Sequence, residues 1–345
     1  MMLSATKKRT MMTIEEIEAA CDASQVLDFS RHILDAPPLS LTQTFYPLGF
    51  PAELHTNSPE MLAQAEERWG VFEKRFDTET IRLDVHVVES ESTECPPAPW
   101  CRFMQPLVVT VADINNYCVA DISLNKTQMT LSTAALRNKA YLRCFFLDGL
   151  VGFHLATRHA TPVHAGCVAL DGHGVLLCGD SGAGKSTLSY ACARSGWTYI
   201  TDDCSFLLNS GTKRLVTGNC HQVRFRPAAK ELFPEVQGLE ITPRATGKPS
   251  IELPTAPMPY MKLSQSAKVD FIVFLNRRCG PTQLRPYRAD VARYFMRQVL
   301  YGTPESLAVP YEAIEHLLAA QVFELQYGDV DGAIDRLQML VREGS

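Results

Sequence analysis

A glycine-rich segment in the middle of the chain constrains its fold more than any other feature. It matches the phosphate-binding P-loop pattern G-x-x-x-x-G-K-[ST]. Glycines let successive backbone N–H groups turn toward phosphate oxygens, and the start of the following helix adds its positive dipole end. The matching residues are Gly179, Asp180, Ser181, Gly182, Ala183, Gly184, Lys185, Ser186 and Thr187. We therefore expect these nine residues to bind a nucleoside triphosphate, with Lys185 at the β- and γ-phosphates and the Ser186 hydroxyl as a ligand of Mg²⁺.

The residues on either side of this segment favour the same interpretation. The short apolar run 174–178 before it predicts a buried strand. Residues 187–194 after it have helical character, and Ser195-Gly196 is a suitable helix end. The alternative is an ordinary glycine-rich turn between a strand and a helix, but the order of strand, loop and helix favours a P-loop.

Composition excludes several classes of partner. A chain of 345 residues is too long for most single cores, so two domains are expected. Its 46% hydrophobic and 21% charged residues are typical of a folded soluble protein. A net charge of −5 argues against a nucleic-acid partner held mainly by phosphate neutralisation. The most apolar region, 141–156, carries charged residues and is too short to span a membrane, so it predicts a largely buried helix.

Cysteine usage and the N-terminus suggest a cytoplasmic location. The eleven cysteines include no C-x-x-C pair, and several lie in apolar runs as small buried side chains of a reducing compartment. Lys7, Lys8 and Arg9 are not followed by an apolar stretch, so no secretory signal is expected, and residues 1–12 are expected to be mobile. Whether the chain forms a homo-oligomer is left open.

The predicted elements divide the chain into an N-terminal α/β accessory domain over 13–132 and a P-loop domain over 133–345. In the second domain, strands do not alternate regularly with helices, so we expect a mixed β-sheet flanked by helices. Helices are expected over 14–21, 59–76, 141–156, 187–194, 227–233, 289–300, 311–320 and 330–341. Strands are expected over 81–88, 107–111, 117–122, 163–170, 174–178, 197–201, 205–208, 214–217, 222–225, 269–275 and 322–326.

Acidic residues and a histidine are the remaining catalytic candidates. Asp202-Asp203 follows a predicted strand, and ligands of open α/β sheets bind at the carboxyl ends of strands. One carboxylate could hold Mg²⁺ and the other could accept a proton from a substrate hydroxyl, whereas a solvated turn is the structural alternative. His164 lies twenty-one residues before Lys185, and a lone histidine is more often structural than catalytic.

Basic residues could stabilise negative charge that develops on a transferred phosphate. The candidates are Arg224 with Arg226 on one face of a predicted strand, Arg244 with Lys248 in a loop expected to form a mobile flap, and Arg277 with Arg278 after the strand 269–275. A role in surface solubility is the alternative for each of them.

Together these segments resemble the catalytic domain of the HPr kinase/phosphorylase family, which belongs to a broader phosphoenolpyruvate carboxykinase-like P-loop fold. The matching pieces are Val163-His164-Ala165, then Gly179 through Ser186, then Thr201-Asp202-Asp203. The match is close over 161–206 and looser to about residue 340. The carboxykinases have their aspartate pair at a shorter distance than the seventeen residues from Lys185 to Asp202, so the kinase branch is more similar.

The resemblance implies a role for each of these residues. Asp202 would take the proton from a serine hydroxyl, Asp203 would orient the site or hold Mg²⁺, and His164 would lie beside the reacting phosphate. Lys185 and Ser186 keep the roles that the loop pattern gives them. The chain is thus expected to be an ATP-dependent kinase that phosphorylates a serine or other hydroxyl of a protein or peptide of unknown identity.

Two departures from the bifunctional members limit what is carried over. Thr187 stands where they usually have Glu, and Gln237 stands where their second signature has Arg. The reverse reaction and HPr as the acceptor are therefore not carried over to this chain. A small-molecule kinase of the carboxykinase-like fold and a nucleotide-binding switch or scaffold without phosphate transfer stay as alternatives.

Overall fold

The computed structural model describes residues 14–23, 39–104, 106–211, 213–245, 247–256 and 258–343. The segment 1–12, predicted to be mobile, lies outside these residues. The chain forms two compact units, Met1–His154 and Leu155–Ser345. The division falls inside helix α5 (Asp148–Arg158), whereas the sequence placed a boundary between residues 132 and 133. The helical region 133–154 belongs to the first unit because it packs within it, as the His154 Nε2 contact with Thr127 Oγ1 at 2.8 Å illustrates.

The first unit contains a seven-stranded mixed sheet in the order β1-β2-β3-β7-β6-β5-β4. β2, β3 and β7 run parallel, and the other neighbours are antiparallel. Its strands are β1 (Leu41–Phe45), β2 (Ala52–Thr56), β3 (Ile81–Val88), β4 (Trp100–Met104), β5 (Leu107–Asp113), β6 (Asn116–Asp121) and β7 (Lys126–Ser132). Its helices besides α5 are α1 (Ile14–Asp22), α2 (Pro59–Trp69), α3 (Thr133–Arg137) and α4 (Lys139–Leu142).

Two predicted helices of this unit differ from the structure. The helix expected over 59–76 begins as predicted, with the Ser58 side chain accepting from the Met61 N–H, but it ends at Trp69. Gly70 follows as its C-cap, and residues 73–80 are extended or irregular. The helix expected over 141–156 contains a π-helical turn, Arg143–Leu147, between α4 and α5. The sequence pattern records apolar spacing but not this local change of hydrogen-bond period.

The second unit contains a large mixed sheet, which confirms the expected mixture of parallel and antiparallel strands. Its main path is β17-β11-β9-β10-β18-β13-β12-β8, with β20 on β18 and β19 on β20. Its strands are β8 (Ala160–Val163), β9 (Ala165–Leu170), β10 (His173–Cys178), β11 (Thr198–Thr201), β12 (Ser205–Leu208), β13 (Leu215–Gly218), β17 (Lys262–Leu263), β18 (Ser266–Arg277), β19 (Gln283–Pro286) and β20 (Gln321–Tyr327).

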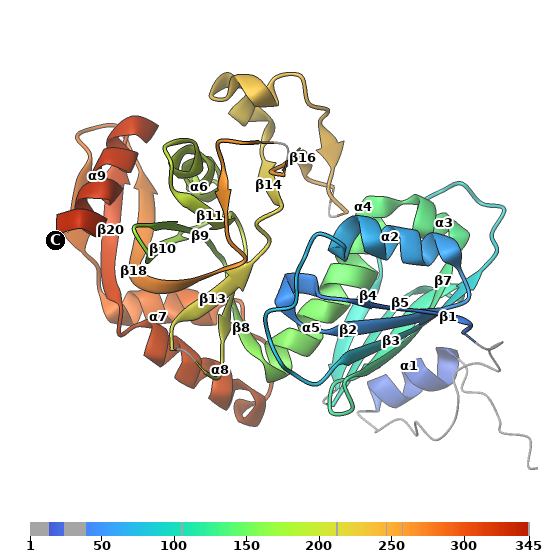
Figure 1. Cartoon of the computed structure of the whole chain (residues 1–345). Coiled ribbons are helices and arrows are strands. Elements are labelled where there is room, and N and C mark those ends of the chain that lie inside the picture. The colour runs from blue at the N-terminus through green and yellow to red at the C-terminus, as the bar shows by residue number, and fades with distance from the viewer. Residues whose placement is uncertain are drawn as a thin grey trace, which may run out of the picture. The chain divides into compact units, whose positions relative to one another are not determined.

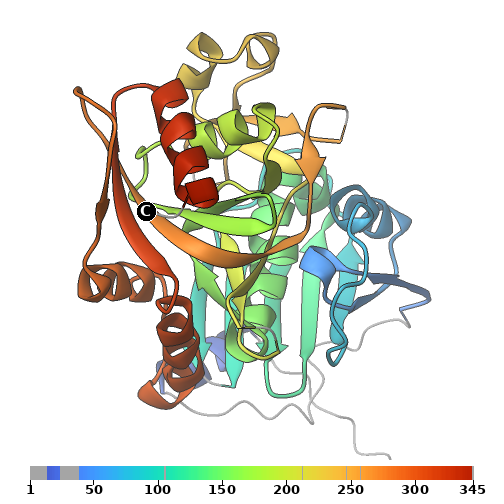
Figure 2. The ribbon, with the colours of Figure 1, turned by 60° about the vertical axis from the view of Figure 1, so that its left-hand side comes forward.

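Helices cover both faces of this sheet (Figures 1 and 2). Along β10, Val175 and Leu177 belong to a buried cluster with residues of α6 (Lys185–Arg194) and α9 (Val330–Glu343). Leu176 and Cys178 belong to a second cluster with residues of α7 (Ala289–Arg297) and α8 (Pro304–Leu317). This alternation explains why the run 174–178 is apolar throughout, since a strand covered on both faces exposes neither set of side chains.

The chain between β13 and β17 forms a small three-stranded sheet. It consists of β14 (Gln222–Phe225), β16 (Pro249–Pro254) and β15 (Thr242–Pro243), in the order β14-β16-β15. The short helix expected over 227–233 is a 3₁₀ helix over Pro227–Glu231. No helix in the described parts of the chain is long and apolar enough to cross a membrane.

Gly174, the second residue of β10, lies very close to β18 and leaves no room for a larger residue. A Cβ atom added at Gly174 would be 2.4 Å from the Lys268 carbonyl oxygen and 3.0 Å from its carbonyl carbon. Gly174→Ala is therefore expected to lower the free energy of unfolding by about 1–3 kcal/mol, because backbone must move to relieve the overlap. Urea denaturation followed by circular dichroism measures the change. Gly238→Ala is the matched control, since nothing lies within 4 Å of its added Cβ, and an equal loss in both variants would contradict the explanation.

Candidate active site

The glycine-rich segment joins the carboxyl end of β10 to the first residue of α6. Its glycines Gly179, Gly182 and Gly184 have φ values of 145°, 97° and 102°, a region that favours glycine. A Cβ at Gly184 would also be 2.3 Å from the Tyr327 hydroxyl. The backbone conformation thus explains why glycine occupies these positions of the segment.

Tyr327, the last residue of β20, fixes the loop from one side. Its hydroxyl donates to the Ala183 carbonyl at 2.8 Å, and burial raises the pKa of this hydroxyl to about 12. The tyrosine is therefore a neutral donor around pH 7. Sequence reasoning missed Tyr327, because its contact spans 144 residues and its only local signal is a place at the end of the predicted strand 322–326.

Lys185 holds the two ends of the loop together. Its ammonium group donates to the Gly179 carbonyl at 2.6 Å and to the Asp180 carbonyl at 3.2 Å, and it lies 3.0 Å from His164 Nε2. The residue is only 6% exposed. Burial lowers the pKa of its ammonium group, and the nearby Asp203 carboxylate opposes that shift most strongly.

Sheet pairing brings His164 to the loop. The residue lies in the one-residue break between β8 and β9, and Ala165 at the start of β9 pairs with Cys178 at the end of β10. Residues 163–170 are therefore two strands rather than the single one expected, because β8 pairs with β12 while β9 pairs with β10 and β11. The break places the imidazole at the same end of the sheet as the loop.

The contacts of His164 assign its tautomer. A lysine ammonium can only donate, so His164 Nε2 must accept from Lys185, and the ring proton of the neutral imidazole is then on Nδ1. Nδ1 lies 3.5 Å from Asp203 Oδ1. Burial, and then the charge of Lys185, lower the pKa of this imidazole, which favours the neutral ring. His164 thus links the lysine to the carboxylate.

Asp202 lies at the carboxyl end of β11 and is buried. Because β11 and β10 both pair antiparallel with β9, their carboxyl ends lie at the same edge of the sheet. Asp202 Oδ1 accepts from the Tyr199 hydroxyl at 3.1 Å, and Oδ2 accepts from the Arg224 backbone N–H at 3.2 Å. Burial, followed by the charge of Asp203, raises the pKa of Asp202 to about 6, although donors that include the Ser186 hydroxyl pull it down.

The neighbouring Asp203 is partly exposed, with 43% of its side chain accessible, and faces His164 and Arg244. One oxygen is near His164, and the other lies 3.8 Å from Arg244 Nη1. Two adjacent carboxylates therefore have different environments: Asp202 is enclosed by hydrogen-bond donors, and Asp203 is open to a ligand.

The predicted basic residues differ in whether their side chains reach the glycine-rich loop. Arg226 donates to Ser181 Oγ at 2.7 Å, so it reaches the loop itself. It follows β14 rather than lying in it, whereas Arg224 lies in the strand and forms an ion pair with Glu252 at 2.9 Å. The Arg224 backbone nevertheless holds Asp202. Lys248 accepts a backbone hydrogen bond from Arg244 across the turn between β15 and β16.

One edge of the large sheet therefore brings together Lys185, His164, Asp202 and Asp203, and Arg226 reaches the loop there. Among the described residues, no group of three or more His, Cys, Asp and Glu side chains is arranged to hold a metal ion. A metal at this edge would need ligands of other kinds beside a carboxylate, such as the Ser186 hydroxyl and the oxygens of a bound phosphate.

Comparison with known proteins identifies no family for this chain. No family model matches it, and no curated protein matches it either. Among solved structures, it is similar to the Hpr(Ser) kinase/phosphatase from Coxiella burnetii, with a TM-score of 0.30 and 13% sequence identity. That alignment covers 53% of this chain and 93% of the other. Because the likeness is so low, the activity of the chain is inferred from the site's own geometry.

The raised pKa of Asp202 predicts how stability depends on pH. The ordinary value is 3.8, so Asp202 binds a proton more tightly in the folded state than in the unfolded chain, and its contribution to stability falls as pH rises from about 4 through 6. Asp202→Asn cannot ionise. Relative to the parent protein, this variant should therefore gain about 2.5 kcal/mol between pH 4 and pH 7.5, in addition to any constant difference.

Urea unfolding across this pH range measures that gain. A companion variant, Asp203→Asn, removes the second cause of the shift, and ¹³C NMR should show the carboxyl of Asp202 titrating at lower pH than in the parent protein. A stability difference between Asp202→Asn and the parent that does not change with pH would show that the carboxyl has no raised pKa.

Proposed function

We propose that the chain is an ATP-dependent kinase that transfers the γ-phosphate to a serine or other hydroxyl of a protein or peptide. One observation carries the proposal: a loop lysine, a neutral histidine and two carboxylates of different character meet at the end of strand β10. Lys185 contacts His164, His164 faces Asp203, and Asp202 adjoins them with a pKa of about 6. Phosphoryl transfer requires this combination of charge neutralisation and a base for the attacking hydroxyl.

The loop supplies the phosphate-binding part of the proposal. Its backbone N–H groups and the start of α6 favour anionic oxygens. The Lys185 ammonium group donates to carbonyls of the loop. From this position its charge would neutralise the β- and γ-phosphates of a bound nucleotide. Arg226 donates a hydrogen bond to the Ser181 hydroxyl, so its guanidinium would add a second positive charge beside the loop.

The residues present fit a magnesium ion bound together with a nucleotide. Ser186 supplies a hydroxyl at the first turn of α6, and Asp203 supplies a partly exposed carboxylate, both of them hard oxygen ligands. When bound, Mg²⁺ would neutralise charge on the phosphates. Asp203 is the better ligand of the two aspartates, since the oxygens of Asp202 already accept from Tyr199 and Arg224.

Asp202 is the proposed general base. A carboxyl with a pKa of about 6 is mostly ionised at pH 7 and is a stronger base than an ordinary aspartate. The attacking hydroxyl oxygen would form a bond to the γ-phosphorus while the bond from that phosphorus to the bridging oxygen of ADP breaks, and the hydroxyl proton would pass to Asp202. His164, held neutral, is positioned to donate from Nδ1 or to orient Lys185.

Asp202→Asn should separate transfer from binding. We expect phosphate transfer to an acceptor to fall by about 10²- to 10⁴-fold, because the base is lost. Nucleotide affinity should change little, since the loop and Lys185 are intact. Incubation with γ-labelled ATP and a lysate of the source cell, followed by identification of the labelled product, measures transfer and names the acceptor. A fluorescent nucleotide analogue measures affinity.

Two controls complete this experiment. Asp171→Asn changes a carboxylate in the exposed turn between β9 and β10, where φ is 52° and asparagine fits well, so it should transfer phosphate at the parent rate. Lys185→Ala should lose nucleotide affinity as well as transfer. An Asp202→Asn protein that transfers at the parent rate would remove Asp202 from the base role. Tight nucleotide binding without any labelled product would favour the switch or scaffold alternative, and a labelled small molecule would favour the small-molecule kinase.

A further inference from the structure

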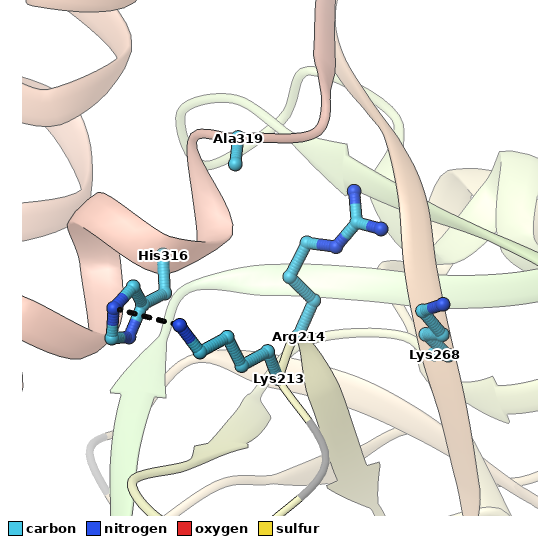
Figure 3. A pocket seen from close by; sticks show the side chains of 5 residues that line it. All are labelled: Lys213, Arg214, Lys268, His316 and Ala319. Atoms are coloured by element: carbon cyan, nitrogen blue, oxygen red, sulfur yellow. Dashed lines mark hydrogen bonds between the residues drawn. The ribbon is translucent and has the colours of Figure 1, made fainter.

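A hollow of about 400 Å³ lies in the second unit, lined by Lys213, Arg214, Lys268, His316 and Ala319 (Figure 3). Its walls come from three elements: the connection between β12 and β13, the first part of β18, and the end of α8. In Figure 3 the Lys213 side chain points to His316, and the guanidinium of Arg214 extends between the helix end and β18. Four of the five lining residues can carry positive charge.

This hollow is remote from the glycine-rich loop along the sheet. Lys268 immediately precedes Val269, which pairs with Gly174 at the start of β10. The loop follows Cys178, which pairs with Phe274. Because β10 and β18 are parallel, the two features lie at opposite ends of the same strand pair. The hollow is therefore separate from the proposed kinase site.

The charges of the hollow are incompletely balanced by the protein. Within the described parts of the chain, Lys268 forms no ion pair or side-chain hydrogen bond, and the Lys213 ammonium group has one hydrogen-bond partner, His316 Nε2 at 3.5 Å. Arg214 lies 3.4 Å from Asp270, but that carboxylate is also 2.9 Å from His173.

The acidic residue next to His316 in sequence does not compensate for these cations. Glu315 on α8 is held by Arg293 at 2.6 Å and by Arg297 at 3.0 Å. Asp270 is thus the one acidic side chain seen to pair with a cation of the hollow among the described residues. Lys213 and Lys268 are exposed but line the same hollow as Arg214, so an anion bound among the three cations would gain favourable electrostatic energy.

The backbone at Arg214 is held in a defined turn conformation. Arg214 has a φ of 64°, a conformation that is unfavourable for a residue other than glycine, asparagine or aspartate. The Val269 N–H donates to the Arg214 carbonyl at 2.8 Å and keeps it there. The turn and this hydrogen bond fix the place from which the Arg214 side chain starts at the hollow.

We infer that this hollow binds a phosphate dianion, either inorganic phosphate or the phosphate group of a small phosphomonoester. The planar guanidinium of Arg214 can donate two parallel hydrogen bonds to phosphate oxygens, and the ammonium groups of Lys213 and Lys268 add charge. The volume exceeds what one phosphate needs and leaves room for a small organic group.

NMR of the His316 ring provides a readout located at the hollow. Titration of the full chain with inorganic phosphate, at constant ionic strength set with chloride, should move the ring resonances of His316 to saturation. Arg214→Gly should weaken the affinity at least about tenfold through loss of charge-assisted hydrogen bonds. Since glycine fits the backbone at this position, the thermal midpoint of Arg214→Gly should not fall, which distinguishes lost binding from lost folding.

Two further variants and a second probe complete the test. Lys268→Ala should also weaken binding, whereas Lys262→Ala, which removes an exposed cation elsewhere in the unit, should bind phosphate with the parent affinity. Glycerol phosphate that binds more tightly than inorganic phosphate would identify a phosphomonoester as the ligand, and equal affinities would identify phosphate alone. The inference is overturned if the His316 resonances do not saturate, or if Arg214→Gly and Lys268→Ala bind phosphate as tightly as the parent protein.

Discussion

The buried ammonium group of Lys185 connects the segments on which the candidate site depends. It bonds to carbonyls at the start of the loop and contacts His164, which reaches it from the neighbouring strand. A buried lysine loses hydration, so these partners must replace water. The contact can form only because β9 pairs with β10 in a register that sets Ala165 opposite Cys178. Loop, histidine and sheet register are therefore parts of one arrangement.

The same edge of the sheet separates the roles of two adjacent carboxylates. Asp202 is enclosed, and its hydrogen bonds from Tyr199 and Arg224 fix its orientation while burial raises its pKa. Asp203, one residue further, faces His164 and Arg244 and remains accessible. The proposed base and the proposed metal ligand would need different environments, and the turn after β11 offers an enclosed and an accessible carboxylate within two residues.

Strand β18 organises the second unit from one end to the other. Its first residues pair with β13 and contribute Lys268 to the basic hollow. Its later residues pair with β10 and β20, beside the glycine-rich loop. Because one strand runs past both places, a single sheet holds the two proposed anion-binding features at opposite ends of β18. Helices on both faces keep water away from its central residues.

Local pattern was enough for the loop glycines and for strands such as Ile81–Val88, because backbone preferences and alternating burial act over a few residues. It also placed Asp202 at a strand end. It did not show the strand break at His164, the polar strand Lys126–Ser132 or the Tyr327 contact. These features depend on pairing between segments that are far apart in sequence. The sequence alone determined which chemical groups are available, and tertiary structure decided which of them meet, because strand register and burial set their distances and pKa values.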